Sequence, residues 1–298
     1  MQAALLDRLR RILADLRRPL IALSGGLDSR FLAHAAHMAR AGGATPLLVH
    51  CRGPHIPENE TASAQAFAAA RDLPLRILDF DPTTIPEIRA NGVKRCYFCK
   101  HALFSAFLTL LNSRWPDDPP PLCDGTNTSD LGLYRPGLQA LKELGIRSPL
   151  AEAGFGKQDI REAARACGLE NPTQQARPCL ITRFAYDLAP TSQALVAAGR
   201  AEGDIAAFVG EKENFRLRLF PPEAADSGAP LPFAAELHLE RDLSPEEEAR
   251  ARALIAARGF HCRAVRVLER ASGTYDAAAG LSAGGSRPDA PRTEESRP

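Results

Sequence analysis

The sequence predicts an α/β protein in which a parallel, doubly wound sheet is followed by a smaller C-terminal α+β domain. Short apolar runs alternate with helical segments in the first half of the 298 residues, as they do in βα units. The first apolar run leads through a glycine pair into a helix, and the alternation changes from Gly154 onward. We expect domains over residues 1–185 and 186–276, and a disordered tail over 277–298.

Four strands are expected in the parallel sheet. The first run, Leu20–Leu23, has no polar alternation, which is typical of a strand buried on both faces. The other expected strands are Pro46–Cys51, Leu75–Phe80 and Pro121–Asp124. The expected helices are an amphipathic one containing Leu5 to Leu16, then Leu27–Arg40, Glu58–Arg71 and Cys96–Leu111. Ligands of such sheets bind beyond the carboxyl ends of the strands.

The segment after Gly154 has the composition of a small α+β domain, whose boundary we expect between Thr182 and Pro190. The expected elements are helices Lys157–Cys167, Ser192–Phe208 and Pro245–Arg258, and strands Asn214–Phe220, Phe233–Leu239 and Cys262–Leu268. Proline, glycine and acidic residues make Pro221–Pro230 an inserted loop.

The composition argues against several classes of function. A net charge of +1 gives no overall field that would gather nucleic acid, so we expect no nucleic-acid partner. No apolar run reaches membrane-spanning length, and the N-terminus lacks the features of a secretory signal. We therefore expect a cytoplasmic protein without a membrane partner. Seven cysteines, an odd number, favour thiols or metal ligands over a disulfide framework.

The glycine turn Ser24-Gly25-Gly26-Leu27-Asp28-Ser29 is the strongest local signal. Glycine adopts backbone angles closed to other residues and leaves no side chain between the main chain and a ligand. Backbone N–H groups at the start of the following helix would point at a group above the turn, and an anion is the natural occupant. The turn is not a Walker A loop, because the glycine-lysine-hydroxyl ending is absent, and it is not the dinucleotide fingerprint G-x-G-x-x-G.

Three cysteines are candidates for chemistry. Cys96 and Cys99 form a CxxC pair at the start of an expected helix, where the helix N-terminus with Arg95 and Lys100 would favour thiolates. Cys179 lies in a short loop between basic residues, and the three sulfurs could hold an iron-sulfur cluster with one open iron. The alternative is that Cys179 is a packed thiol. The remaining cysteines lie in apolar segments and are assigned to the core: Cys51, Cys123, Cys167 and Cys262.

The glycine turn resembles the SGGxDS signature of the PP-loop ATP pyrophosphatases, which cleave ATP between its α and β phosphates. Further motifs, in order along the chain, are similar to the LarE family of ATP-dependent sulfur transferases. These motifs are Arg95–Lys100, Asp124–Asp130, Tyr134–Gly137, Arg147–Leu150, Lys157, Cys179–Arg183, Gly259–Phe260 and Ser272–Gly273. The resemblance implies that a carboxylate of a pyridinium dicarboxylate mononucleotide is adenylylated and converted to a thiocarboxylate, a step toward the nickel-pincer nucleotide cofactor.

The resemblance also assigns an ATP site. The implied ATP-binding residues are Ser24, Gly25, Gly26, Asp28, Ser29, Gly125 and Thr126. Asp28 would work with Mg2+. Asp130 is either a second Mg2+ carboxylate or a helix cap.

Two arginines are candidates for substrate binding. Arg216 and Arg218 alternate along an expected strand, so they share a face and could bind the phosphate of the mononucleotide. The alternative is a solvated strand face. Arg183, beside Cys179, is a third candidate for substrate contact. The segment Ala235–Leu239, with a glutamate and a histidine, departs from the family pattern and leaves the mononucleotide specificity open.

The sulfur source has two alternatives in similar proteins. A single cysteine, here Cys179, can give up its own sulfur and become dehydroalanine, or a 4Fe-4S cluster on three cysteines can carry an extra sulfide. The presence of Cys96 and Cys99 favours the cluster. Other functions also stay open, namely tRNA thiolation by a related enzyme and a regulatory module that binds ATP without consuming it. The resemblance suggests a homo-oligomer.

Overall fold

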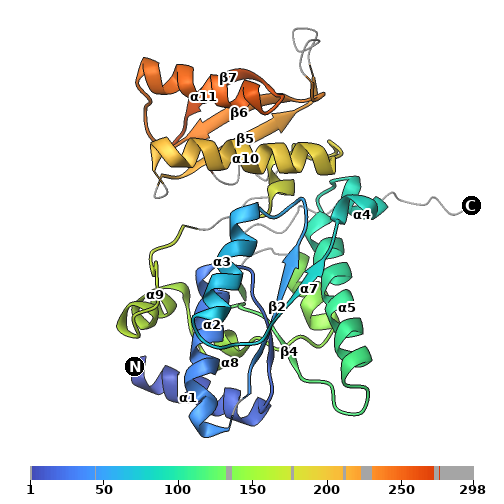
Figure 1. The fold of residues 1–298 in the computed structure, drawn as a ribbon, viewed down its shortest axis with the longest axis vertical. Helices are drawn as coiled ribbons and strands as arrows, with labels where there is room; N and C mark the ends of the chain where they lie inside the picture. The colour runs from blue at the N-terminus through green and yellow to red at the C-terminus, as the bar shows by residue number, and fades with distance from the viewer. Residues whose placement is uncertain are drawn as a thin grey trace, which may run out of the picture.

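Two separate sheets, one above the other in Figure 1, organise the chain. The computed structural model describes residues 2–43, 45–131, 136–175, 178–210, 213–222, 230–271 and 275. Several predicted features lie outside the described residues: the tail 277–298, most of the insert Pro221–Pro230, and the motif residues Tyr134, Arg135 and Ser272–Gly273.

The first sheet has four parallel strands in the order β3-β2-β1-β4. Their bounds are β1 Leu20–Ala22, β2 Leu47–Arg52, β3 Leu75–Asp79 and β4 Leu122–Cys123. Leu20 of β1 is in register with Leu47 on one side and with Leu122 on the other. The strand that leads into the glycine turn is therefore central, and both of its edges are paired.

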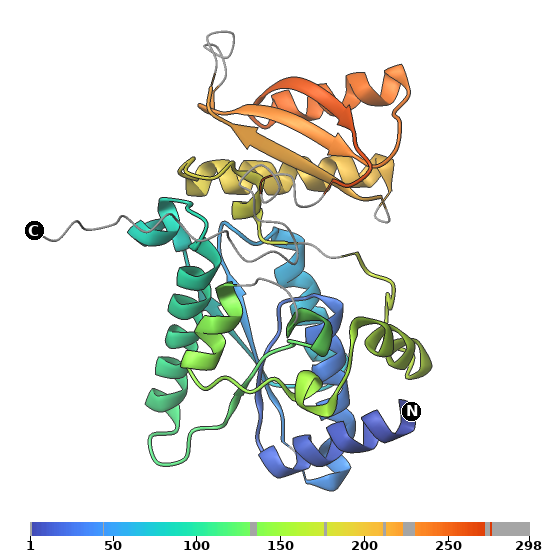
Figure 2. The ribbon, with the colours of Figure 1, turned by 180° about the vertical axis from the view of Figure 1, so that it is seen from behind.

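Helices cover both faces of this sheet, because successive residues of its central strands point into different cores. Ile21 and Leu48 pack in a core with α1, α2, α3 and α9, whereas Leu20 and Val49 pack in a second core with α5 and α7 (Figures 1 and 2). The bounds are α1 Gln2–Leu16, α2 Leu27–Met38, α3 Glu58–Ala69, α5 Arg95–Arg114, α7 Pro136–Glu143 and α9 Lys157–Ala166. This arrangement confirms the doubly wound α/β prediction.

Several short helices escaped prediction because one turn is too short to show an apolar period. They are α4 Pro86–Arg89, α6 Thr128–Leu131, α8 Pro149–Ala153, and the 3-10 segments η1 Ala39–Gly42, η2 Pro82–Thr84 and η3 Leu180–Arg183. In the part of the chain that the structure describes, no helix has the length and apolar character needed to cross a bilayer.

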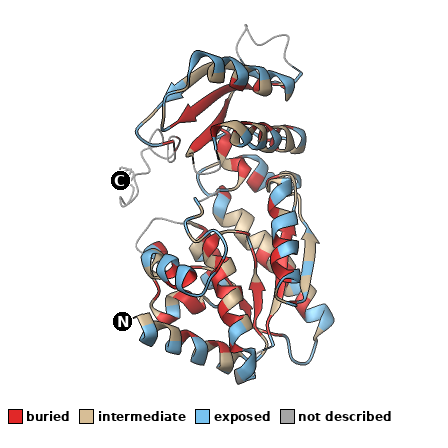
Figure 3. Ribbon diagram, turned by 60° about the vertical axis from the view of Figure 1, so that its left-hand side comes forward, coloured by how far each residue is buried: buried red, intermediate tan, exposed pale blue. Residues whose placement is uncertain are grey.

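The second sheet has the order β5-β6-β7, with β5 antiparallel and β7 parallel to β6. Its elements are β5 Phe215–Phe220, β6 Ala234–Leu239 and β7 His261–Val267, with α10 Ser192–Val209 and α11 Pro245–Ala257. Leu217 and Leu237 pack with Ala198 of α10 and Ile255 of α11, so the two helices cover one face. Strands β5 and β6 are buried almost throughout (Figure 3). The small mixed sheet fits the α+β prediction, and the boundary near residue 185 stays a prediction.

Candidate functional site

The glycine turn joins β1 to α2 at the carboxyl edge of the first sheet. Its two serines face each other, with 3.1 Å between the Oγ atoms of Ser24 and Ser29. The Ser29 hydroxyl also accepts from the Ser24 N–H at 3.2 Å and donates to the Gly26 carbonyl at 3.0 Å. The turn is thus closed by its own hydroxyl groups ahead of the N-terminus of α2, an arrangement suited to an anion.

Gly25 is glycine for two physical reasons. Its φ of +84° lies in the left-handed region, and a Cβ there would collide with the carboxylate of Glu60. Glu60, in the first turn of α3, is buried at 7 % exposure. The contact between Glu60 and the glycine turn was not predicted, because Glu60 belongs to a separate helix and nothing in its local sequence indicates the contact.

The loop after β4 meets the glycine turn at the same sheet edge. The side-chain amide of Asn127 donates to Asp28 at 3.0 Å. A Cβ on Gly125 would lie 2.9 Å from the backbone nitrogen of Ser29, so glycine permits this close approach. Thr126, which is buried, donates its hydroxyl hydrogen bond to Asp124.

Asp130 has the geometry of a helix cap. Its carboxylate accepts from the Asn127 N–H at 3.4 Å, three residues back at the start of α6. The other oxygen of Asp130 is 3.1 Å from Nζ of Lys157. These contacts place Asp130 inside the first turn of α6 and not at the residue that opens the helix, and its Mg2+ role stays a prediction.

The three candidate cysteines differ in their exposure. Cys96 is exposed in the first turn of α5, whereas Cys99 and Cys179 are half-buried against the core of the second sheet. Burial, followed by the neighbouring Cys179, Cys96 and Cys51, raises the pKa of Cys99 well above its ordinary value. Burial also raises the pKa of Cys179 to about 11, although Arg183 and Arg95 act in the opposite direction.

The prediction that the helix N-terminus favours thiolates is therefore wrong for Cys99, where desolvation dominates. Within the described ranges, no group of three or more His, Cys, Asp or Glu side chains is arranged to hold a metal ion. The predicted 4Fe-4S site on Cys96, Cys99 and Cys179 thus finds no support in how these thiols are arranged. Arg177, part of the predicted basic setting, lies outside the described residues.

The remaining cysteines only partly match their assignment to the core. Cys51 and Cys123 are buried, and Cys262 is half-buried. Cys167 is exposed, which corrects its assignment, because it caps the C-terminus of α9 at the surface.

Buried arginines line the second sheet next to Cys179. Arg216 is 9 % exposed and Arg218 is 4 % exposed, so the solvated strand face is excluded. Arg218 donates to the carbonyl of Thr182 at 2.9 Å, which ties β5 to η3. Burial and the nearby Arg183 lower the pKa of Arg216 to about 10. The carboxylates of Glu202 and Glu240 act on the pKa of Arg216 in the opposite direction.

Arg183 has a buried carboxylate partner that sequence reasoning missed. Its guanidinium donates to both carboxylate oxygens of Glu202 on α10, at 2.7 and 2.8 Å. One of these oxygens also accepts from the Leu217 N–H at 2.8 Å. Glu202 sits in an alanine-rich helix, where nothing in the local pattern distinguishes it from a surface acid.

Two contacts bring the thiol segments to the edge of the first sheet. Nζ of Lys100, directly after Cys99, is 3.9 Å from the Asp124 carboxylate beyond β4. The Leu180 N–H, directly after Cys179, donates to the His55 carbonyl at 3.0 Å in the loop beyond β2. Both contacts lie at the carboxyl ends of parallel strands, where ligands of this architecture bind.

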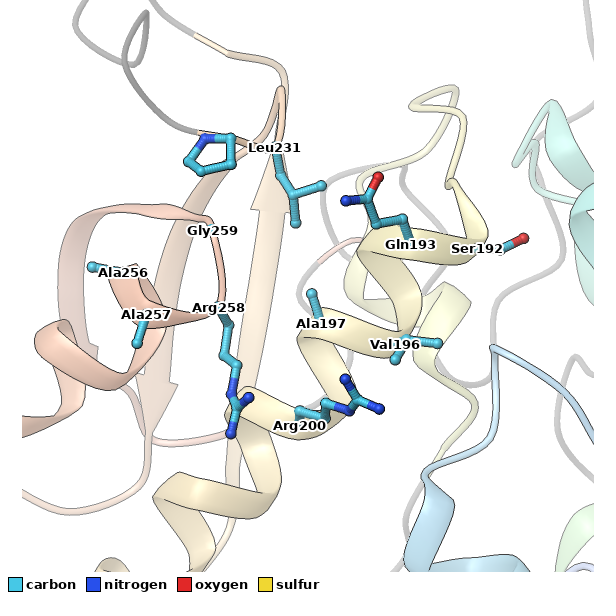
Figure 4. Close-up of a pocket in the computed structure, with 11 residues that line it drawn as sticks. Ser192, Gln193, Val196, Ala197, Arg200, Leu231, Ala256, Ala257, Arg258 and Gly259 are labelled. Carbon is cyan, nitrogen blue, oxygen red and sulfur yellow. The ribbon is translucent and has the colours of Figure 1, made fainter.

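An open groove elsewhere contains none of the predicted site residues. It has a volume of about 620 Å³ and lies between α10 and α11, lined by small side chains such as Ala197 and Ala256 (Figure 4). Its two arginines have carboxylate partners, Arg200 with Glu58 at 2.8 Å and Arg258 with Asp204 at 2.7 Å. We therefore place the candidate site at the sheet edge and not in this groove.

Comparison with known proteins places the chain in a family. It is 36 % identical over 197 residues to the uncharacterized protein slr1717 of Synechocystis, covering 66 % of this chain and 72 % of that protein. The chain belongs to the slr1717 family. The uncharacterized protein MJ0830 of Methanocaldococcus jannaschii is 33 % identical over 171 residues, which is 57 % of this chain and 62 % of the relative.

A further relative of this chain has a name that states an activity. The pyridinium-3,5-bisthiocarboxylic acid mononucleotide synthase of Lactiplantibacillus plantarum is 28 % identical over 190 residues, 64 % of this chain and 67 % of that enzyme. No protein-family profile matches the chain. The named relative agrees with the LarE resemblance of the motifs.

Proposed function

We propose that the protein is an ATP-dependent sulfur transferase that adenylylates a carboxylate of pyridinium-3,5-biscarboxylate mononucleotide and converts it to a thiocarboxylate. The observation that carries this proposal is that two groups of residues lie at the carboxyl edge of the first sheet. One is the glycine turn, which is closed by its own hydroxyls and contains Asp28. The other is the half-buried thiol of Cys179 with the buried Arg183 and Arg218 beside it. The name of the Lactiplantibacillus plantarum relative supports the same substrate class.

Adenylylation solves the problem that a carboxylate has no competent leaving group. A carboxylate oxygen of the substrate attacks the α-phosphorus of ATP, the bond to pyrophosphate breaks, and pyrophosphate departs. Backbone N–H groups of the glycine turn and the hydroxyls of Ser24 and Ser29 stabilise the charge that grows on it. Asp28 would hold the Mg2+ that neutralises this charge.

Sulfur transfer follows at the acyl carbon. A sulfur nucleophile attacks this carbon and AMP leaves, so the carboxylate becomes a thiocarboxylate. Cys179 is the residue we assign to deliver that sulfur. Arg216 and Arg218 would hold the phosphate of the mononucleotide, because buried guanidinium groups bind phosphate with two parallel hydrogen bonds. We assign no step to an iron-sulfur cluster.

Incubation of the full chain with ATP, Mg2+ and the pyridinium mononucleotide tests this proposal. Mass spectrometry should detect the thiocarboxylate product and AMP. Loss of one sulfur from Cys179 in the intact protein would establish the sacrificial route. Activity that requires RNA, or ATP binding without any AMP, would contradict the proposal and favour a tRNA-thiolating enzyme or a regulatory module.

A further inference from the structure

Arg95 is a buried arginine that the proposed reaction does not use. It opens α5 and is 5 % exposed. Its Nη1 donates to the side-chain oxygen of Asn91 at 2.8 Å. In the described part of the chain, no carboxylate pairs with Arg95, and its buried Nε has no hydrogen-bond partner. Buried charges in proteins are normally paired, so a buried guanidinium without an acid beside it points to an anionic ligand.

The edge of Arg95 that makes no hydrogen bond is the edge that other arginines of this chain use for carboxylates. Arg52 donates from Nε and Nη2 to the two oxygens of Asp79, at 2.6 and 2.9 Å. Arg183 uses the same two nitrogens for Glu202, at 2.7 and 2.8 Å. Among the described residues, Arg95 has no acceptor for either nitrogen. Its Nε and Nη2 therefore form a fork that matches a carboxylate.

Two neighbours hold the guanidinium group of Arg95 in place. Asn91 is fully buried, and its side-chain amide donates to the carbonyls of Ala185 and Leu188, at 2.7 and 3.0 Å. These two bonds orient the side-chain oxygen of Asn91 toward Arg95. The ring of Tyr186 supplies the second contact, with its centroid 4.3 Å from Cζ of Arg95. A side chain that is already fixed loses little conformational freedom when it binds a ligand.

The segment that holds Arg95 continues directly from the thiol loop. Cys179 is the N-cap of η3, and Tyr186 lies shortly after the end of η3. Arg218, which we assign to the phosphate of the mononucleotide, donates to the Thr182 carbonyl within η3. The guanidinium groups of Arg95 and Arg218 thus contact the same short segment at different points. A carboxylate-binding fork and a phosphate-binding arginine therefore both adjoin the segment that begins at Cys179.

We propose that Arg95 binds the carboxylate of the pyridinium dicarboxylate that is not being adenylylated, and so selects substrates with two carboxylates. This inference rests on the proposed function, which supplies the dicarboxylate. During adenylylation one carboxylate must reach the α-phosphorus of ATP, while the phosphate of the mononucleotide lies on Arg216 and Arg218. The second carboxylate then needs a cation of its own, because a buried carboxylate without a partner is costly.

Binding of two mononucleotides to the full chain, without ATP, tests the assignment. Pyridinium-3,5-biscarboxylate mononucleotide is compared with pyridinium-3-carboxamide mononucleotide, which keeps the phosphate and the ribose and has no carboxylate. In calorimetry, Arg95→Gln should weaken the dicarboxylate roughly tenfold or more, because a charged hydrogen bond is lost, and leave the carboxamide unchanged. Arg89→Gln is the matched control, an exposed arginine at the end of α4, and should change neither affinity.

Arg95→Lys keeps the charge without the fork and guards against misfolding of the glutamine variant. It should weaken the dicarboxylate less than Arg95→Gln does, and again leave the carboxamide unchanged. Equal weakening of both mononucleotides would show that Arg95 only supports the structure, and unchanged affinity for the dicarboxylate would remove the site. Either result overturns the proposal.

The thiol of Cys179 is the other anion that Arg95 could serve. Alkylation by iodoacetamide across a range of pH, followed by peptide mapping, reports the thiolate of Cys179. A higher pH of half-maximal alkylation in Arg95→Gln, with the affinity for the dicarboxylate unchanged, would assign Arg95 to the thiol and overturn the proposal.

Addition of ATP separates this inference from the proposed function. Pyrophosphate release should show a lower kcat/KM for the dicarboxylate in Arg95→Gln. The kcat/KM for pyridinium-3-carboxylate mononucleotide should be unchanged, because its single carboxylate must occupy the reacting position. Binding of the dicarboxylate that depends on Arg95, without any pyrophosphate release, would refute the proposed function and leave the carboxylate site. Equal kcat/KM for the dicarboxylate in both proteins would refute the site and leave the function.

Discussion

At the scale of single residues, burial decides the chemistry more than neighbouring charge does. The pKa of Cys179 rises to about 11 by burial even though Arg183 and Arg95 oppose it. His55 behaves in the same way, because burial lowers its pKa to about 4. Reactivity at this site therefore depends on bases and acceptors placed beside the thiols, which the sequence pattern does not reveal.

His55 predicts a specific dependence of stability on pH. Its pKa falls from 6.5 to about 4 on folding, so the unfolded chain binds the proton first as the pH drops. The contribution of His55 to the free energy of unfolding is constant above pH 6.5. It is lost progressively as the pH falls toward 4, by about 3 kcal/mol in total. Chemical unfolding of wild type and His55→Asn across this window should show a shallower pH dependence for the variant. Parallel profiles would show that His55 is solvated.

The buried pair of Arg183 and Glu202 predicts a large stability cost. Glu202→Gln leaves the Arg183 guanidinium buried without its carboxylate, which costs about 3–5 kcal/mol. Glu58→Gln, which removes the exposed partner of Arg200, is the matched control and should cost at most about 1 kcal/mol. Equal losses in denaturant titrations would mean that the Arg183 pair is no stronger than a surface pair.

At the scale of elements, β1 and its turn were the most predictable part of the chain. A short apolar run before two glycines allows a buried strand and a tight turn, and little else. Strand β4 was harder, since only Leu122 and Cys123 of the predicted segment pair with β1. For the short helix α6, the only sequence signal was a possible cap at Asp130, because its 4 residues are too few to form an apolar period.

Gly25→Ala tests whether the turn requires glycine. The substitution incurs a left-handed strain of about 1–2 kcal/mol and a collision with Glu60, so both stability and ATP affinity should fall. Gly43→Ala is the matched control, because Gly43 has φ +94° and no atom within 4 Å of an added Cβ. It should lose stability only. Calorimetric ATP binding equal for both variants would show that the turn does not hold the nucleotide.

The arginine face of β5 predicts a selective loss of substrate binding. Arg218→Gln should weaken the mononucleotide interaction roughly tenfold or more, because a buried charged donor is lost, and leave ATP affinity unchanged. Arg76→Gln, an exposed arginine of β3, is the control and should change neither affinity. Kinetics at varied substrate concentration give the comparison. A loss of ATP affinity in Arg218→Gln would place the arginines in the nucleotide site instead.

At the scale of the whole molecule, the sequence predicted the order of strands and helices along the chain. It was less informative about contacts between segments that are far apart in the sequence. The alternation of strands and helices predicted both sheets. The Cys179 loop meets the β2 loop through Leu180 and His55, residues separated by more than a hundred positions, which no local pattern specifies. The homo-oligomer and the cytoplasmic location stay predictions.

Release of pyrophosphate tests the central claim most directly. The wild-type chain, given ATP and Mg2+, should release pyrophosphate and AMP in equal amounts only when pyridinium-3,5-biscarboxylate mononucleotide is added. Asp28→Asn should abolish this release, whereas Asp118→Asn, at the exposed partner of Arg18, should preserve it. Release of ADP and phosphate, or no pyrophosphate from the wild type with both substrates present, would contradict the account.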